Sequence, residues 1–300
     1  MGAILNPLYT AVSWVIITFH DLLSFTNNED LQWSIGIIAL VILIRIILIP
    51  LFVKQIKSQR ALTALQPHMK AIQKKHKDDR QKQSEEMMKL YKEHKTNPFA
   101  SCFPILAQAP IFFALFTVLN GISQNKPHGL LKGEYLLSAQ EAHFFGAPLS
   151  GTFLGSTDGG TKLIAIALII FMSATTFTTQ RQLMVKGMPK MDSSNNMMLQ
   201  QQKIMLYLFP IIFAVTGVNF PIGVLIYWST TNLWTWGQQY YVIKRNPTPG
   251  SPAYEELQKK KAAKGLLDEK SNNEGGTTIT ENPTDTGGQR KQPKRKKKKR

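Results

Sequence analysis

Hydrophobic and polar residues in this chain are separated into long blocks and are not interleaved at the period of one helix or strand. Five apolar stretches carry at most one charged residue each and approach or reach the roughly 20 residues that a helix needs to cross a bilayer core. They are residues 31–53, 98–120, 163–180, 204–218 and 222–243. A turn signal, Asn219-Phe220-Pro221, separates the last two. The pattern predicts an all-α membrane protein with five transmembrane helices.

The first 30 residues are also apolar, and we interpret them as a helix lying in the membrane interface. Apolar side chains recur at helical spacing, while polar ones occupy other positions on the helical wheel. The apolar positions are Leu8, Val12, Val15, Phe19 and Leu22. The alternative is a sixth span, which the length allows but Pro7, His20 and Asp21 disfavour. A basic start and a small-residue cleavage pattern, typical of signal peptides, are missing.

The distribution of Lys and Arg predicts the orientation, because basic residues accumulate on the cytoplasmic side. Residues 54–97 hold 12, residues 181–203 hold 4 and residues 244–300 hold 16, whereas residues 1–31 hold none and residues 121–162 hold 3. These counts alternate as five spans require. We therefore expect a multi-pass protein of a bacterial plasma membrane, with the amino terminus outside and the carboxyl terminus in the cytoplasm.

Residues 54–97 have the pattern of a cytoplasmic helical hairpin. Two short apolar seams follow heptad spacing, and Asp78-Asp79 between them predicts a turn. The seams are Leu62, Leu65, Met69, Ile72 and His76, then Met87, Leu90, Tyr91 and His94. For the outer loop 121–162 the sequence predicts no particular fold.

The polar segment 244–300 is predicted to be a disordered cytoplasmic tail. Its last eleven residues carry nine basic side chains and no acidic or aromatic one, which is typical of binding to phosphate backbones. These are Arg290, Lys291, Lys294, Arg295, Lys296, Lys297, Lys298, Lys299 and Arg300. Ribosomal RNA and anionic lipid headgroups are the expected partners. The alternative is a solvated tail that aids solubility.

Charge and composition change the picture in two further ways. Lys and Arg number 36 against 19 Asp and Glu, so the net charge is +17. One cysteine, Cys102, excludes an intramolecular disulfide framework and an all-cysteine metal site. Walker, GxSxG and HExxH motifs are also missing, so we expect no enzyme activity, no metal and no cofactor.

Arg45 is the unusual residue of the first apolar stretch. It precedes Lys54 by about 13 Å of helix, and an arginine in the apolar region costs roughly 2.5–3.5 kcal/mol on insertion scales. The other four stretches contain no Asp or Glu to pair with it. We expect Arg45 to face a hydrated pocket; the alternative is snorkelling or satisfaction by backbone carbonyls.

Polar side chains of the other stretches are candidates for lining the same groove. They are Gln108 in the second stretch, Ser173, Thr176 and Gln180 in the third, and Tyr227, Trp228, Asn232 and Gln239 in the fifth. Each has a structural alternative, because Ser and Thr often bond their own helix backbone and Asn or Gln can join helices.

Several short motifs occur in the order of the predicted spans and resemble those of the YidC/Oxa/Alb membrane protein insertases. The similarity covers residues 31–243 and is closest to the shorter Gram-positive or actinobacterial type. The motifs are Arg45 with Pro50-Leu51, Leu65-Gln66-Pro67, Tyr91-Lys92-Glu93, Asn97-Pro98, Pro104, Gln108-Ala109-Pro110-Ile111, Ala114-Leu115-Phe116, Pro221-Ile222-Gly223, Tyr227-Trp228, Asn232 and Gln239.

The resemblance implies a hydrophilic groove that opens to the cytoplasm and to lipid, with Arg45 attracting acidic groups of a client protein. The client helix then leaves along the third and fifth spans, without a nucleotide. The implied partners are nascent membrane proteins, the Sec translocon, the ribosome bound by the basic tail, anionic lipids, and targeting factors received by the hairpin.

Two other functions remain open on the sequence. Arg45 is also compatible with an anion-selective channel or transporter, which predicts solute flux. The basic tail is compatible with a passive membrane scaffold that docks ribosomes, which predicts that Arg45 is dispensable.

Overall fold

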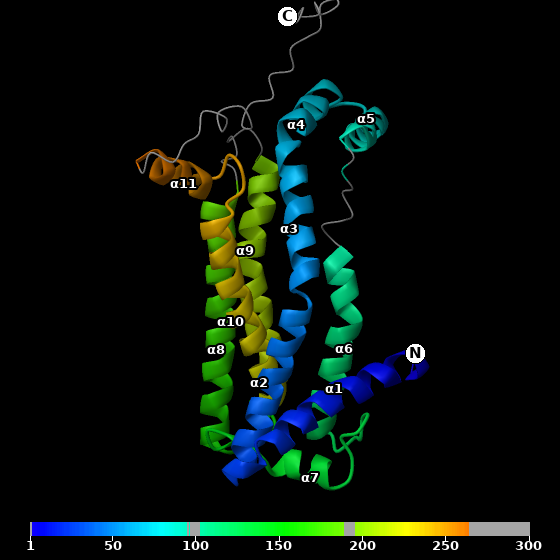
Figure 1. Ribbon diagram of the computed structural model, residues 1–300, viewed down its shortest axis with the longest axis vertical. Coiled ribbons are helices and arrows are strands. Elements are labelled where there is room, and N and C mark those ends of the chain that lie inside the picture. The colour runs from blue at the N-terminus through cyan, green and yellow to red at the C-terminus, as the bar shows by residue number, and fades with distance from the viewer. Residues whose placement is uncertain (1, 95, 97–102, 189–195, 264–300) are drawn as a thin grey trace, which may run out of the picture.

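The computed structural model describes residues 2–94, 96, 103–188 and 196–263, and they form an elongated helical bundle (Figure 1). Along its long axis run α2 (Glu29–Ile47) continued by α3 (Ile49–Ala64), α6 (Phe103–Ser123), α8 (Gly159–Gln182), α9 (Asn196–Gly217) and α10 (Ile222–Arg245). We call the two ends of the bundle the α7 end and the hairpin end, after the elements that lie there.

A break between α2 and α3 interrupts what the sequence predicted as one span. α2 ends at Ile47, Leu48 is a turn residue, and α3 begins at Ile49. Pro50 has no backbone N–H to donate, and its ring crowds the carbonyl four residues earlier, so a regular helix cannot continue through it. The break at Leu48 therefore lies three residues beyond Arg45.

The α7 end is closed by a tightly packed cap. α1 (Gly2–Leu22) crosses the bundle obliquely and packs against α2 and α6 (Figure 1). The short 3₁₀ helix η1 (Ser24–Thr26) leads from α1 to α2, whose first turn is capped by Asn28. α7 (Glu134–Glu141) and the strand pair β1 (His143–Phe144) and β2 (Ala147–Pro148) complete the cap. Residues 121–162, for which the sequence predicted no fold, are thus well structured.

The hairpin end carries two short helices, α4 (Gln66–Lys75) and α5 (Arg80–Glu93), which pack against each other. Asp79 caps α5 by accepting a hydrogen bond from the backbone N–H of Lys82 at 3.0 Å. The two apolar seams meet between the helices: Leu65 and Leu90 are buried, and the hydroxyl of Tyr91 lies 3.8 Å from Sδ of Met69.

The helices near residues 181–263 extend beyond the predicted spans. α8 continues into a π-helical turn, η3 (Leu183–Gly187), and α10 reaches Arg245. α11 (Pro252–Ala263) lies where the sequence predicted the start of a disordered tail (Figure 1). Ser251 starts α11 by accepting a hydrogen bond from the N–H of Tyr254, Pro252 suits the first turn, and Glu256 pairs with Lys260. Residues 264–300, including the nine basic residues, lie outside the described part of the chain.

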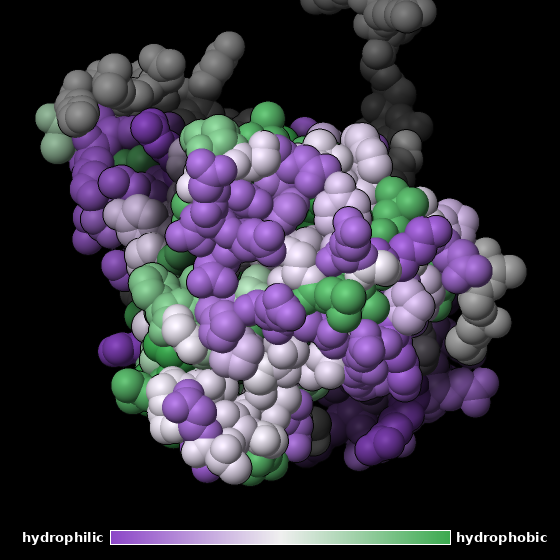
Figure 2. Space-filling view, turned by 90° about the horizontal axis from the view of Figure 1, so that it is seen from below, coloured by the Kyte–Doolittle hydropathy of each residue, from purple (hydrophilic) through white to green (hydrophobic). Residues whose placement is uncertain are grey.

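The sides of the bundle are apolar where they face outward. Large hydrophobic side chains are exposed along α8 and α9, including Leu163, Ile170, Tyr207 and Val215. Two helices of the described chain, Glu29–Ile47 and Gly159–Gly187, are long and apolar enough to cross a membrane, and 108–123 and 203–217 are shorter apolar segments. Purple and white residues cover most of the α7-end face instead (Figure 2). A polar end and apolar sides are typical of a bundle surrounded by lipid.

Candidate functional site

A cavity of about 510 Å³ opens between α2, α3, α6 and α10 on the hairpin side of the core, and we call it the Arg45 cavity. Its polar side chains are Arg45, Gln55, Gln108, Thr231, Thr235 and Gln238. Aromatic and aliphatic side chains complete the wall, among them Phe52, Phe112, Tyr227 and Trp228. The cavity combines one cation with neutral hydrogen-bonding groups on an apolar frame, which suits a polar, flexible or anionic guest.

Arg45 is half-buried and lies near the carboxyl end of α2. Within the described residues no carboxylate forms an ion pair with it. Along the helices it is about 13 Å from Lys54 and about 23 Å from Asp30, so it lies well inside the bundle. A buried guanidinium without a carboxylate keeps its attraction for an incoming negative charge.

Tight packing stops at the level of this cavity on two neighbouring helices. In α2 the buried residues lie between Gln32 and Val41, and none follows within the helix. In α10 the buried run extends from Ile222 to Ser229 and resumes only at Ile243. On these two helices the packing is therefore dense toward the α7 end and more open from Arg45 onward.

Four of the predicted groove residues line the Arg45 cavity: Arg45, Gln108, Tyr227 and Trp228. The ring of Trp228 packs against Phe112, Phe213 and Phe220, with centroid distances of 5.9, 5.5 and 5.0 Å. Of these rings Phe112 and Trp228 line the cavity, and the aromatic contacts join α6, α9 and α10 beside it.

Five of the predicted groove residues do not line this cavity, namely Ser173, Thr176, Gln180, Asn232 and Gln239. The hydroxyl of Ser173 donates to the carbonyl oxygen of Pro210 at 3.3 Å, which joins α8 to α9. The hydroxyl of Thr176 donates to its own helix, to the carbonyl oxygen of Met172 at 2.8 Å. These two contacts are the structural alternatives that the sequence left open for Ser and Thr.

The sequence missed Gln55, Thr231, Thr235 and Gln238. On α10 the lining face follows Tyr227, Thr231, Thr235 and Gln238, at intervals of four, four and three residues. The face predicted through Asn232 and Gln239 is displaced by one position from it. The helical spacing of these residues could have indicated the lining face of α10. Polar residues occur at 231, 232, 235, 238 and 239, however, so the sequence did not decide between two neighbouring faces.

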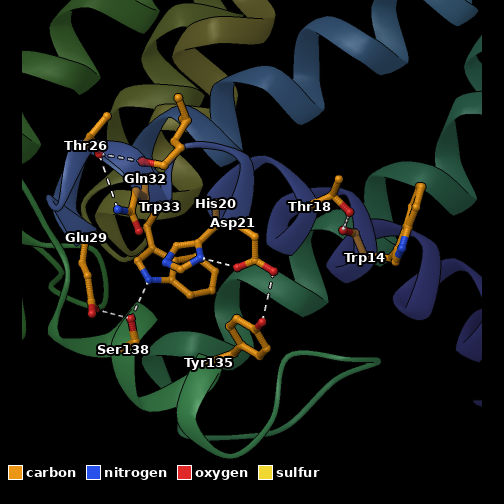
Figure 3. Close-up of polar contacts among 11 residues, drawn as sticks. Trp14, Thr18, His20, Asp21, Thr26, Glu29, Gln32, Trp33, Tyr135 and Ser138 are labelled. Carbon is orange, nitrogen blue, oxygen red and sulfur yellow. Dashed lines mark hydrogen bonds and ion pairs between the residues drawn. The ribbon is translucent and has the colours of Figure 1, made fainter.

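A polar network closes the opposite end of the bundle (Figure 3). The indole N–H of Trp33 donates to the hydroxyl of Ser138 at 2.8 Å, and that hydroxyl donates to the carboxylate of Glu29. The His20 ring stacks near Trp33 with centroids 4.3 Å apart, and the Tyr135 hydroxyl donates to Asp21 at 3.1 Å. Side chains of α1, α2 and α7 are thus joined at the α7 end, next to the packed core.

Comparisons with known proteins place the chain in a family. A model of the family "60Kd inner membrane protein" matches residues 24–249. A Streptomyces avermitilis protein named membrane protein insertase YidC is 53% identical over 263 residues, covering 83% of this chain and 61% of that protein. A Tropheryma whipplei protein of the same name is 36% identical over 276 residues, covering 86% of this chain and 89% of that protein.

A solved structure titled "Active YidC insertase crystal structure with the first transmembrane domain resolved" is also similar. It is 26% identical, with a TM-score of 0.49, and the match covers 77% of this chain and 46% of that one.

Fold and matches together define the class, a helical protein of the bacterial plasma membrane. The chain belongs to the 60Kd inner membrane protein family, the YidC/Oxa/Alb group whose motifs its sequence carries. It spans about three fifths of the Streptomyces relative's length and most of the Tropheryma relative's.

Proposed function

We propose that this chain is a membrane protein insertase that passes the polar end of a short client into the Arg45 cavity while the client's apolar helix moves into lipid. The observation that carries the proposal is a half-buried arginine without a carboxylate partner among the described residues, in a cavity of about 510 Å³ where the packed core ends. The names of the Streptomyces and Tropheryma relatives support the same activity.

The proposed orientation places the hairpin end in the cytoplasm and the α7 end outside. Basic residues supply the reason, since 54–97 and 181–203 hold 12 and 4 of them at the hairpin end. The five spans are then α2 with the start of α3, α6, α8, α9 and α10. In this orientation the Arg45 cavity faces the cytoplasm, and the cap formed by α1 and α7 closes the outer side.

Arg45 acts in this proposal by electrostatic attraction. A carboxylate of the client gains more from Arg45 inside the bundle than it would in water, because the effective dielectric constant is lower. The client's polar residues lose hydrogen bonds to water when they enter the cavity. Polar side chains of the wall replace part of these bonds, namely Gln55, Gln108, Thr231 and Gln238. The cavity also shortens the dehydrated path across the bilayer, and α1 with α7 prevents a continuous pore.

The driving force is the burial of the client's apolar helix in lipid, worth roughly 0.8 kcal/mol for each CH₂ group. The exposed apolar side chains of α8 and α9, such as Ile170 and Ile212, provide a surface along which such a helix can pass. No nucleotide enters this step, so the protein acts by lowering a barrier and not by supplying energy.

Partners follow from the same orientation. In the proposal the α4–α5 hairpin receives nascent clients or targeting factors, and the nine basic residues of segment 290–300 bind ribosomal RNA or anionic lipid. Cooperation with the Sec translocon belongs to the proposal as the route for clients with several spans.

The test is reconstitution of the purified chain in liposomes without ATP or another nucleotide. We expect a single-span client with an acidic outer tail to become protease-protected faster than in empty liposomes, while a fluorescent-anion assay shows no flux. Anion flux without client protection would support the channel alternative, and tail-dependent ribosome binding without client protection would support the scaffold. Either result overturns the insertase proposal.

A further inference from the structure

A second pocket, of about 660 Å³, lies at the hairpin end between η3, the last turn of α10, and α11. It is distinct from the Arg45 cavity, with which it shares no lining residue. We call it the basic pocket, because Lys186, Lys244, Arg245, Lys260 and Lys261 line it against a single acidic side chain, Glu256.

The charge of the basic pocket is only partly compensated. Glu256 accepts a hydrogen bond from Nζ of Lys260 at 2.6 Å, one helical turn away. Lys186, Lys244 and Arg245 are exposed, and within the described residues they form no ion pair. Three cations from two different helices therefore converge on one hollow whose single acidic lining residue, Glu256, is hydrogen-bonded to Lys260, which suits a phosphate group.

The floor of the basic pocket is apolar, which separates it from an ordinary basic surface. Ile243 is buried, and Leu257 and Ala253 of α11 are half-buried beside it. Gly187 permits this close packing, since a Cβ there would meet side-chain carbons of Leu183 at 3.1 Å and Ile243 at 3.4 Å. The ligand that fits has an anionic head and an apolar body.

Aromatic residues mark the level of the membrane interface at the same place. Trp236 and Tyr240 stack with centroids 6.3 Å apart, and Nζ of Lys244 lies 5.5 Å from the centre of the Tyr240 ring. Tyr240 and Tyr241 are exposed on α10. Exposed Trp and Tyr one turn before Lys and Arg are typical of the boundary between lipid tails and headgroups. α11 projects sideways from the bundle at this level (Figure 1).

We infer that the basic pocket binds the headgroup of an anionic phospholipid, with the phosphate among Lys186, Lys244 and Arg245 and an acyl chain beside Tyr240 and Ile243. RNA is the less suitable ligand, because its sugar-phosphate backbone offers no acyl chain for the apolar floor of the pocket. The inference uses the proposed bilayer position but does not depend on client insertion.

The test measures lipid binding to the purified full-length chain by native mass spectrometry, with phosphatidylglycerol and phosphatidylcholine as the probes. In the triple variant Lys186→Gln, Lys244→Gln, Arg245→Gln we expect the affinity for the first phosphatidylglycerol to fall roughly 100-fold, because each of the three basic side chains at an anionic surface contributes about fivefold. The matched control, Lys74→Gln, Lys75→Gln, Lys77→Gln, removes the same charge from the α4–α5 hairpin and should leave this affinity within about twofold.

A further variant distinguishes the loss of a binding site from the loss of folding. Glu256→Gln removes the one acidic side chain and releases Lys260, so it should tighten phosphatidylglycerol binding, which a collapsed pocket cannot do. Equal affinities in the triple variant and the wild type would overturn the inference, and so would equal losses in the triple variant and the control. Displacement of the lipid by millimolar inorganic phosphate would assign the pocket to free phosphate, and a loss confined to an RNA oligonucleotide would assign it to nucleic acid.

Because no client is present, a negative result here leaves the insertase proposal standing, and the two proposals fail separately.

Discussion

Trp33 of α2 donates its indole N–H to the hydroxyl of Ser138 in α7 at 2.8 Å, although 105 residues separate the two in the sequence. Trp33 is fully buried, so this hydroxyl is the group that replaces water for the indole. The contact joins α2 to α7 of the cap and holds closed the end of the bundle that lies opposite the Arg45 cavity.

Ser138→Ala should therefore lower the free energy of unfolding by about 1–3 kcal/mol, the cost of leaving a buried donor without an acceptor. Thermal unfolding of the detergent-purified protein measures it. Ser84→Ala, on the exposed side of α5, is the matched control and should have no effect beyond about 0.5 kcal/mol. Equal stabilities of the two variants would show that the Trp33–Ser138 contact is unimportant.

Gly129 and Gly133 give a second, paired prediction. Both have positive φ, +61° and +57°. A Cβ at Gly129 would lie 2.4 Å from Oγ of Ser13 and from the carbonyl oxygen of Tyr9, whereas nothing lies within 4 Å at Gly133. Gly133 combines this φ with a ψ of −131°, so Gly133→Ala should cost only the strain of a backbone conformation that L residues rarely adopt, about 1–3 kcal/mol. Gly129→Ala should cost clearly more, because it also separates the outer loop from α1.

The melting temperatures of these two variants, compared with that of the wild type, test the pair. Equal melting temperatures of Gly133→Ala and Gly129→Ala would mean that backbone strain alone accounts for the loss of stability. The contact between α1 and the loop would then contribute nothing to the stability of the fold.

Asp158 predicts a pH dependence at the start of α8. Its carboxylate accepts hydrogen bonds from the backbone N–H of Thr161 at 2.7 Å and from the Thr161 hydroxyl at 2.9 Å. These bonds hold the pKa of Asp158 below its usual 3.8. Because the pKa in the folded state is depressed, the stabilisation is complete above the unfolded value and is lost as the pH falls through the folded value.

Asp158→Asn keeps an acceptor for the cap but removes the titration. We expect wild type to be more stable than this variant near pH 7, and the gap to close as the pH falls below about 4. Melting curves recorded across this range in one detergent measure it. A gap that stays constant down to about pH 3 would contradict the assignment of the titrating group to Asp158.

The hairpin should unfold separately from the bundle. Leu90 is one of its few buried residues, and a Leu→Ala change at such a site costs about 2 kcal/mol or more. We expect Leu90→Ala to accelerate tryptic cleavage within 66–93 and to leave the melting temperature of the bundle nearly unchanged. Met88→Ala, at an exposed position on the same helix, should cleave like wild type.

Hydrophobic periodicity predicted helices that pack against the next helix in the sequence. The seams containing Leu65 and Leu90 predicted α4 and α5, because an antiparallel hairpin buries side chains that are spaced by the helical repeat. Arg45 was recognisable for a different reason: a charge in an apolar stretch carries a large free-energy cost and needs a cause.

The remaining features depend on contacts between distant residues. No local sequence pattern links Trp33 to Ser138. The same holds for the hydroxyl of Ser13, which accepts a hydrogen bond from the N–H of Leu130 at 2.8 Å. The cap could therefore not be predicted from residues 121–162 alone. The lining face of α10 was ambiguous by one position, because polar residues occur on both neighbouring faces of this helix. α11 was missed because its composition is polar, and its start at Ser251-Pro252 is a local signal that the charge of the tail obscured.

The central claim is that the positive charge of Arg45 attracts the polar end of a client. Its electrostatic origin predicts an order among variants, since Arg45→Lys keeps the charge, Arg45→Ala removes it and Arg45→Glu reverses it. Lys57→Glu, on the exposed face of α3, is the matched control for the change of charge.

The most direct measurement is the rate at which each variant, reconstituted in liposomes, inserts a single-span client with an acidic tail and the same client with a neutral tail. We predict rates for the acidic tail in the order wild type, Arg45→Lys, Arg45→Ala and Arg45→Glu, with Lys57→Glu close to wild type and a much smaller spread for the neutral tail. Equal rates for Arg45→Lys, Arg45→Ala and Arg45→Glu would contradict the account.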